Sequence, residues 1–188
     1  SVSNGGRAGL SDSFLAALWA TDFLFSVAGR GAEGVNFHCN LKPGSYSAIS
    51  ATKGEPRYTV HPLYYALLLY HDAGKGRLLP TTTPSAANVV AHATLADDGQ
   101  VRVILVNKEL SRPVTATLQV GDRFRAGGVR RLAAPQATAK EGVTYADAAV
   151  GADGRWLPPL TTEKERAVRD GRVTVELAAA SALVLTLK

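Results

Sequence analysis

Gly34-Val35-Asn36-Phe37-His38-Cys39 is the one run among residues 1–75 whose pattern predicts a β-strand. A helix-forming stretch, residues 11–28, precedes it, and a second one, residues 61–73, follows after a longer loop. Apolar residues on both sides of the run are typical of a parallel strand covered by helices. Because a lone strand has no neighbour for its backbone hydrogen bonds, either the rest of its sheet lies outside this sequence or the segment does not fold as a strand.

Both helix-forming stretches carry end signals. In the first, Ser11 is the expected N-cap and Gly29 the expected C-terminal cap. In the second, Pro62 fits the first turn and Gly74 ends the pattern. Spacings of three and four predict one wide apolar stripe on the first helix: Phe14, Leu15, Leu18, Trp19, Phe23 and Val27. The expected buried side of the second helix consists of Leu63, Tyr64, Leu67, Leu68 and Tyr70.

After residue 76 the sequence changes to short β-rich runs. The predicted strands are residues 88–95, 101–106, 114–120, 128–132, 173–177 and 182–187. Turn sequences punctuate them at residues 97–99, 121–122, 153–154 and 170–171, a spacing typical of an antiparallel sandwich. Residues 134–168 are predicted to be long loops around one short strand.

The predicted fold class is therefore α/β plus all-β. Residues 1–75 are expected to be the last elements of a (β/α)8 barrel, because a strand followed by a helix is the repeating unit of such folds. Residues 76–188 are expected to be a C-terminal antiparallel β-sandwich, with the boundary near residues 74–80.

Composition limits the classes of function. The chain has 188 residues, 46% of them hydrophobic, and no apolar run long enough to span a membrane. The net charge of +5 falls mostly after residue 76 and indicates a solvated basic surface or a preference for an acidic partner. No motif indicates nucleic acid. The single cysteine, Cys39, rules out an internal disulfide framework and disfavours a zinc cluster.

In a (β/α)8 barrel the active-site residues lie at the carboxyl ends of the strands and in the loops that follow. This rule selects His38, Cys39 and the loop 41–60 with Tyr46, together with the glycine-rich loop 1–9. His38 also fits a structural hydrogen-bonding role, the glycines also fit a tight turn, and Cys39 fits a small buried filler. The carboxylates before residue 77 form no obvious acid–base pair: Asp12, Asp22, Glu33, Glu55 and Asp72. No serine nucleophile elbow, phosphate loop or metal-ligand cluster is present.

Four segments resemble glycoside hydrolase family 79, which includes bacterial β-glucuronidases and heparanase-like enzymes. They are Ser1-Val2-Ser3-Asn4-Gly5-Gly6, residues 9–25, Gly34-Val35-Asn36-Phe37-His38 and residues 61–68. Residues 77–188 are similar to the C-terminal β-sandwich of that family in pattern only. The resemblance implies a retaining hydrolase that cleaves β-linked glucuronic acid without a cofactor or a metal. It also implies that both catalytic glutamates lie upstream of this chain, so that the chain alone is inactive.

The resemblance assigns substrate contacts to five residues. Backbone N–H groups of Asn4, Gly5 and Gly6 would hold the sugar carboxylate, Tyr46 would contact the sugar, and His38 would line the pocket. Ser3 departs from a tyrosine that the family often has near this position. The expected partners are a glucuronide or acidic glycan and the N-terminal part of the same enzyme, with no nucleic acid and no membrane. The sequence does not decide the compartment, and a secreted or periplasmic location is compatible with it.

Two alternatives stay open at this point. The chain is also compatible with a nicked fragment that stays bound to its N-terminal part, because a broken barrel exposes apolar surface. It is also compatible with a non-catalytic carbohydrate-binding or structural β-sandwich module, for which the basic bias and Trp156 are the motivation.

Overall fold

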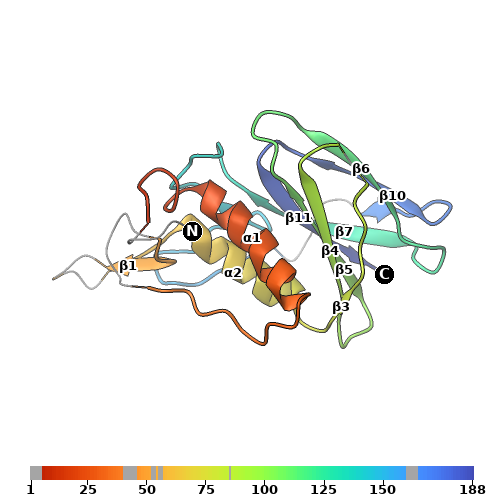
Figure 1. Ribbon diagram of the computed structural model, residues 1–188, viewed down its shortest axis with the longest axis horizontal. Coiled ribbons are helices and arrows are strands. Elements are labelled where there is room, and N and C mark those ends of the chain that lie inside the picture. The colour runs from red at the N-terminus through yellow and green to blue at the C-terminus, as the bar shows by residue number, and fades with distance from the viewer. Residues whose placement is uncertain (1–5, 40–45, 52–53, 55–56, 85, 160–164) are drawn as a thin grey trace.

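The structure, a computed structural model, describes residues 6–39, 46–51, 54, 57–84, 86–159 and 165–188. Two helices and a set of antiparallel strands make up this part of the chain (Figure 1). The helices are α1 (Phe14–Ala28) and α2 (Pro62–Ala73), and the strands are β1 (Ile49–Ala51), β2 (Tyr58–Val60), β3 (Arg77–Leu79), β4 (Val89–Leu95), β5 (Val101–Asn107), β6 (Val114–Gln119), β7 (Ala126–Ala133), β8 (Thr144–Tyr145), β9 (Arg166–Ala167), β10 (Arg172–Leu177) and β11 (Ser181–Leu187).

The strands form one large sheet, one small sheet and a hairpin. The large sheet has seven strands in the order β3-β4-β5-β11-β7-β8, with β9 also paired to β7. The small sheet consists of β10 and β6, and the hairpin of β1 and β2. All six strands predicted after residue 76 form. The glycines of the four predicted turns all have positive φ, as tight reversals require: Gly99, Gly121, Gly154 and Gly171.

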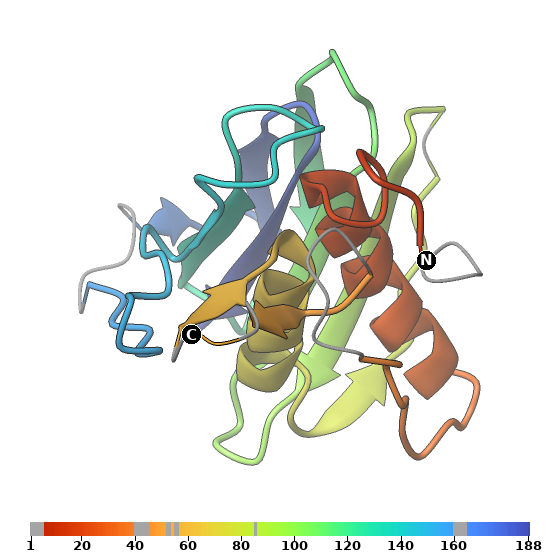
Figure 2. The ribbon, with the colours of Figure 1, turned by 90° about the vertical axis from the view of Figure 1, so that its left-hand side faces the viewer.

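The large sheet is the middle of three layers. Strand β11 shows why, because its side chains alternate between the two faces. Ala182 and Val184 join an apolar cluster with α1 and α2, whereas Leu183 and Leu185 join a second cluster with β10 and β6. The helices therefore cover one face of the large sheet and the small sheet covers part of the other (Figures 1 and 2).

Helix α1 differs from the prediction at its start and in its orientation. Its N-cap is Ser13 rather than Ser11, and Gly29 is the C-cap as predicted. Small side chains on one face pack closely on α2 and the sheet: Ala16, Ala17, Ala20 and Thr21. Because that face is turned inward, much of the predicted stripe is turned outward, and Trp19 is 37% exposed.

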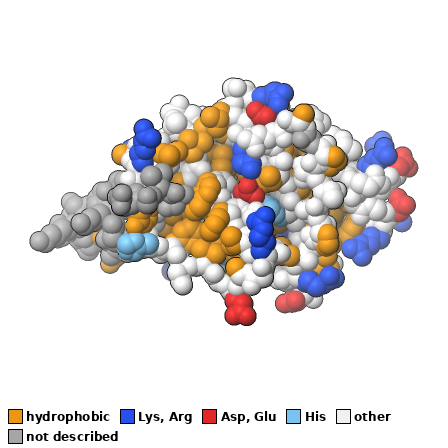
Figure 3. All heavy atoms as spheres, viewed as in Figure 1, with side chains coloured by type: hydrophobic (Ala, Val, Ile, Leu, Met, Phe, Trp, Pro, Cys, Tyr) orange, Lys and Arg blue, Asp and Glu red, His pale blue; other side chains and the backbone are white. Residues whose placement is uncertain are grey.

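The outward face of α1 forms an apolar patch on the surface (Figure 3). Trp19 and Phe23 stack with their ring centroids 4.9 Å apart, and Leu15 and Val27 are half-buried beside them in the helical repeat. We call these four residues the α1 patch. Apolar groups gathered in this way on one helix face are typical of a surface that another part of a protein covers.

Helix α2 begins at Pro62 and is capped by Gly74, as predicted. Its buried side is rotated from the predicted one and consists of Pro62, Leu63, Tyr65, Ala66, Leu69 and Ala73. This face is chosen by the contact with both α1 and the sheet. After it, Gly76 has φ +113°, and a Cβ at this position would collide with the backbone of Leu95 and Ala96, so only glycine fits the passage into β3.

The predicted strand at residues 34–39 does not form. These residues have no strand pairing, and most of them are exposed, although Phe37 packs against the helical cluster. A strand is stable only when a neighbour takes its backbone hydrogen bonds, and no such neighbour lies beside this segment within the described residues. Neither described helix is long and apolar enough to cross a membrane.

Candidate functional site

Three of the predicted site residues lie together. The Tyr46 hydroxyl is 2.6 Å from Nδ1 of His38, and the centroids of the two rings are 5.6 Å apart. The hydroxyl donates to Nδ1 when that nitrogen carries no proton. A Cβ built on Gly6 would lie 3.1 Å from Cδ1 of Tyr46, so the backbone at Gly6 faces the tyrosine ring. Segments that lie far apart in the sequence thus converge at one place.

Local structure explains the position of Gly6. Its φ is +95°, and a side chain would also meet Ser11 at 3.0 Å, so a glycine is needed here. The loop that follows is closed by hydrogen bonds from the Arg7 N–H to Ser11 Oγ (2.9 Å) and from the Ser11 N–H to the Arg7 carbonyl (2.8 Å). These bonds hold the backbone of residue 6 against Tyr46.

Tyr46 and His38 are held by the hairpin that follows them. Ser47 is buried, and the Ala48 carbonyl accepts a hydrogen bond from the His61 N–H at 2.9 Å, which joins the hairpin to the start of α2. Next to His38, Cys39 Sγ donates to the carbonyl of Ile49 in β1 at 3.6 Å. Cys39 is exposed, so the prediction of a buried filler is wrong, because the absent strand leaves its neighbours open to solvent.

The remaining predicted residues, Asn4 and Gly5, lie outside the described residues, as does Ser3. Their expected contacts with the sugar carboxylate stay predictions. Within the described part of the chain, no group of three or more His, Cys, Asp or Glu side chains is arranged to hold a metal ion.

Asp12 belongs to a cavity of about 440 Å³ beside the candidate site, which His61 and Lys140 also line. Its carboxylate accepts from the Gly9 N–H at 2.6 Å and pairs with Lys140 Nζ at 2.7 Å. Burial acts to raise the pKa of Asp12, but these hydrogen bonds outweigh it and lower the pKa. Burial also lowers the pKa of His61, whose Nε2 lies 2.7 Å from Ser50 Oγ.

Asp22 joins α1 to the large sheet. Its Oδ1 accepts from His92 Nε2 and its Oδ2 from Lys108 Nζ, both at 2.9 Å. The hydrogen bond from His92, together with the Lys108 ammonium, holds the pKa of Asp22 far below its ordinary value despite partial burial. A carboxylate with such a low pKa stays ionised and is a poor proton donor at neutral pH.

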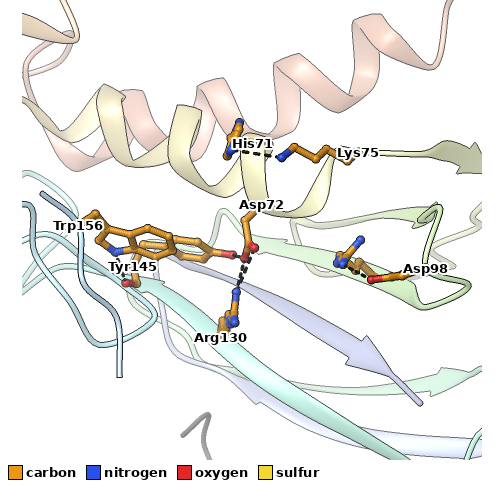
Figure 4. A network of polar contacts seen from close by, with 8 residues as sticks. His71, Asp72, Lys75, Asp98, Arg130, Tyr145 and Trp156 are labelled. Carbon is orange, nitrogen blue, oxygen red and sulfur yellow. Dashed lines mark hydrogen bonds and ion pairs between the residues drawn. The ribbon is translucent and has the colours of Figure 1, made fainter. Parts of the chain in front are cut away.

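Asp72 joins the end of α2 to the same sheet (Figure 4). It accepts from Arg130 Nη1 at 2.8 Å and from the Tyr145 hydroxyl at 2.6 Å. Burial, and then the Asp72 charge, raise the pKa of Tyr145, so its hydroxyl keeps its proton and serves as a donor. Trp156 stacks on Tyr145 with centroids 5.3 Å apart, and its Nε1 donates to the Tyr145 carbonyl at 3.0 Å.

The three aspartates share one task that sequence reasoning did not identify. Each lies before or in a helix and pairs with a cation that follows it by at least 58 residues in the sequence: Asp12 with Lys140, Asp22 with Lys108, and Asp72 with Arg130. No local motif could have predicted these pairs, because they depend on how the helices lie on the sheet.

Comparison with protein families gives one match. The model described as "Glycosyl hydrolase family 79 C-terminal beta domain" matches residues 91–184. These residues belong to residues 77–188, which form the two sheets and which we call the sheet region; there the sequence pattern carried the weaker resemblance. No curated protein matches the sequence.

Solved structures of glycoside hydrolases share the fold. A 4-O-α-L-rhamnosyl-β-D-glucuronidase from Fusarium oxysporum 12S, solved in complex with Rha-GlcA, superposes with a TM-score of 0.83 at 24% identity, over 100% of this chain and 42% of that one. A GH51 α-L-arabinofuranosidase from Thermotoga petrophila RKU-1 gives 0.67 at 14% identity, over 94% and 38%. A GH30 endoxylanase from Clostridium papyrosolvens C71 gives 0.63 at 13% identity, over 94% and 39%.

These likenesses concern the fold, because the identities are low. The chain spans less than half the length of each of the three structures. The likeness to the glucuronidase covers the whole chain, so the two helices belong to the shared fold together with the sheets.

Proposed function

This chain belongs to the family of the glycosyl hydrolase family 79 C-terminal beta domain, and on that premise we propose that it is part of a retaining glycosidase that cleaves β-linked glucuronic acid. The proposed arrangement is the end of a (β/α)8 catalytic barrel in residues 1–75, followed by a C-terminal β-sandwich in residues 76–188. The catalytic glutamates would come from residues upstream of this chain.

The convergence of Gly6, His38 and Tyr46 carries the proposal. A uronic acid bears one carboxylate, which needs hydrogen-bond donors in a fixed geometry. The Tyr46 hydroxyl lies 2.6 Å from His38 Nδ1, and it is free to donate to a carboxylate when Nδ1 carries the proton and donates to the tyrosine oxygen; the backbone at Gly6 lies against the ring. Asn4 and Gly5 would add backbone N–H groups to the same place.

The contacts of the aspartates support the proposal that the catalytic carboxylates lie upstream and that this chain contributes substrate contacts. Retaining hydrolysis needs two carboxyl groups roughly 5–5.5 Å apart, one to attack the anomeric carbon and one to protonate the leaving group. Asp12, Asp22 and Asp72 are each engaged by a cation of the sheet region. These three carboxylates are therefore committed to structural pairs, and the proposed catalytic pair lies upstream of this chain.

Two features support a covering N-terminal part. The α1 patch is an apolar surface with an exposed tryptophan. Residues 34–39 have a strand-like sequence but no neighbouring strand among the described residues, and they do not form a strand. In the proposed barrel an upstream strand would take the backbone hydrogen bonds of residues 34–39, and an upstream helix would cover the α1 patch.

The alternative of a carbohydrate-binding sandwich gains little from Trp156. This side chain is half-buried, stacks on Tyr145 and donates its N–H to the Tyr145 carbonyl. It therefore serves to hold the loop after β8, rather than to offer a free aromatic surface to a glycan.

The test is an assay of the full-length protein on 4-nitrophenyl β-glucuronide and on 4-nitrophenyl β-glucoside. We expect a higher kcat/KM for the glucuronide, because the donors around Tyr46 favour a carboxylate. Equal or lower values for the glucuronide would refute the specificity, and no hydrolysis of either would refute the enzyme proposal. Intact mass under denaturing conditions tests the nicked form, since two species would indicate cleavage and one full-length species would exclude it.

A further inference from the structure

A second groove is lined in part by the same hairpin. It has a volume of about 520 Å³, within the range of small-molecule sites. Its lining comes from the hairpin, from the first turn of α2 and from the turn at residues 150–154. Ile49, which lines the groove, follows Tyr46 by three residues, so the groove begins within about 10 Å of the candidate site along the chain. Sequence reasoning did not identify this groove.

The hairpin presents one of its faces to the groove. Ile49 lies opposite Val60 in the ladder, and Tyr58 lies two residues before Val60, so these three side chains share a face. Ile49 and Val60 are half-buried and form an apolar floor, whereas Tyr58 is 70% exposed at the rim. Within the part of the chain that the structure describes, the Tyr58 ring belongs to neither apolar cluster.

The opposite wall is held rigidly. Tyr64 of α2 lines the groove, and the neighbouring Tyr65 hydroxyl accepts a hydrogen bond from the Val150 N–H at 3.0 Å. Val150 also forms a β-bridge with Trp156, and the Gly154 N–H donates to the Gly151 carbonyl at 2.9 Å. Because these bonds fix the turn at residues 150–154 against α2, the groove is preformed and costs little ordering on binding.

The charges of the groove favour an acidic ligand. Asp153 is already engaged by Arg155, at 3.7 Å between Oδ2 and Nε, and accepts from the Arg155 N–H at 3.0 Å. Arg57, which also lines the groove, has no ion-pair partner within the described part of the chain. A guanidinium there offers several N–H donors to hydroxyl or carboxylate groups.

We infer that this groove is a glycan subsite for a sugar unit on the aglycone side of an acidic oligosaccharide. The inference rests on the proposed function, because it gives the substrate of that same site. A pyranose ring has an apolar face of C–H groups and an edge of hydroxyls. Tyr58 and Tyr64 supply aromatic surface for the face, and Arg57 and the backbone of residues 151–154 supply polar groups for the edge.

The test compares two substrates in the full-length protein: a hyaluronan tetrasaccharide with glucuronic acid at its non-reducing end, and methyl β-glucuronide. The methyl group is too small to reach the groove. For Tyr58→Ala we expect the ratio of the two kcat/KM values, tetrasaccharide over methyl glucuronide, to fall about tenfold. Tyr58→Phe keeps the ring and is expected to keep the ratio within about twofold of the wild-type value. Leu110→Ala, which changes a similarly exposed apolar residue outside the groove, is the matched control.

An unchanged ratio for Tyr58→Ala, or an equal fall for Tyr58→Ala and Leu110→Ala, overturns the subsite. If the wild type hydrolyses neither glucuronide, the proposed function fails, and direct titration with the tetrasaccharide decides about the groove. Weaker binding by Tyr58→Ala than by Tyr58→Phe then supports a glycan site, and no binding by the wild type overturns it. Thermal unfolding of each variant separates loss of binding from loss of folding.

Discussion

Residues 6–74, the helical region, and residues 77–188, the sheet region, differ in how far each satisfies its own backbone hydrogen bonds and buries its own apolar side chains. The sheet region pairs its strands internally and buries an apolar cluster between its two sheets. The helical region has no such internal completion, because its helices bury one side against the large sheet and leave the α1 patch outward. The predicted strand at residues 34–39 has no strand partner among the described residues.

The difference separates the part of the chain with its own paired sheets from the part that carries the candidate site. The helical region carries Gly6, His38, Tyr46 and the hairpin, and it is attached to the sheet region by an apolar cluster and by three aspartate–cation pairs. The sheet region acts as the scaffold, and the candidate site lies on a part of the chain that packs on this scaffold. The family match over residues 91–184 covers the scaffold, whereas the candidate site lies before it.

The largest expected effect comes from the scaffold. Leu185→Ala removes a side chain with no exposure from the cluster between the sheets and should lower the free energy of unfolding by about 2–5 kcal/mol. Leu69→Ala, in the helical cluster, is the matched comparison. Hydrogen exchange should show faster exchange in both regions for Leu185→Ala, and mainly in residues 6–74 for Leu69→Ala. Equal patterns for the two variants would contradict the dependence of one region on the other.

A smaller effect is expected from the ion pair of α1. Asp22→Asn should lower the free energy of unfolding by about 2–3 kcal/mol at pH 7, because His92 and Lys108 lose a charged acceptor. The pKa of Asp22 is lowered on folding from an ordinary value of 3.8, so its contribution is present above about pH 4 and is lost as the pH falls toward the folded pKa. Denaturant titrations at several pH values should show a shallower acid loss for the variant. A parallel loss in both proteins would refute the role of Asp22.

The α1 patch offers a test of the covering part. Trp19→Gln in the full-length protein should lower the free energy of unfolding by about 1–2 kcal/mol, because the proposed barrel buries the exposed part of the ring. Leu110→Gln serves as the control, since Leu110 is 61% exposed and the change should stay within about 0.5 kcal/mol. Equal small effects for the two variants would mean that the α1 patch faces solvent in the whole protein.

The smallest effect on stability should accompany a clear effect on activity. Tyr46→Phe removes the hydroxyl next to His38 and should change the free energy of unfolding by less than about 0.5 kcal/mol, because the bond is exposed. The kcat/KM for 4-nitrophenyl β-glucuronide in the full-length protein should fall about tenfold, through loss of a hydrogen bond to a charged group. A fall in stability without a fall in activity would assign Tyr46 to structure.

Local sequence patterns predicted where helices and strands begin and end more reliably than they predicted which side of each element is buried. The ends of α2 at Pro62 and Gly74 and the turns with Gly99 and Gly171 follow from backbone preferences that act over a few residues. The outward position of Trp19 could not be predicted, because an all-round apolar helix does not say which face meets the sheet. The prediction of a strand at residues 34–39 was wrong for a related reason. The apolar pattern is typical of a strand, but a strand also needs a neighbouring strand, which a local pattern does not reveal.

The sequence by itself determined the two helices, the six main strands and the resemblance to family 79, because periodicity, turn residues and short motifs are local properties of the chain. Only the tertiary structure decided that Asp12, Asp22 and Asp72 pair with cations of the sheet region, and that Gly6, His38 and Tyr46 meet. The physical reason is that such contacts depend on which helix face packs on the sheet. That choice is made by close packing across the whole core, and no window of the sequence contains both sides of it.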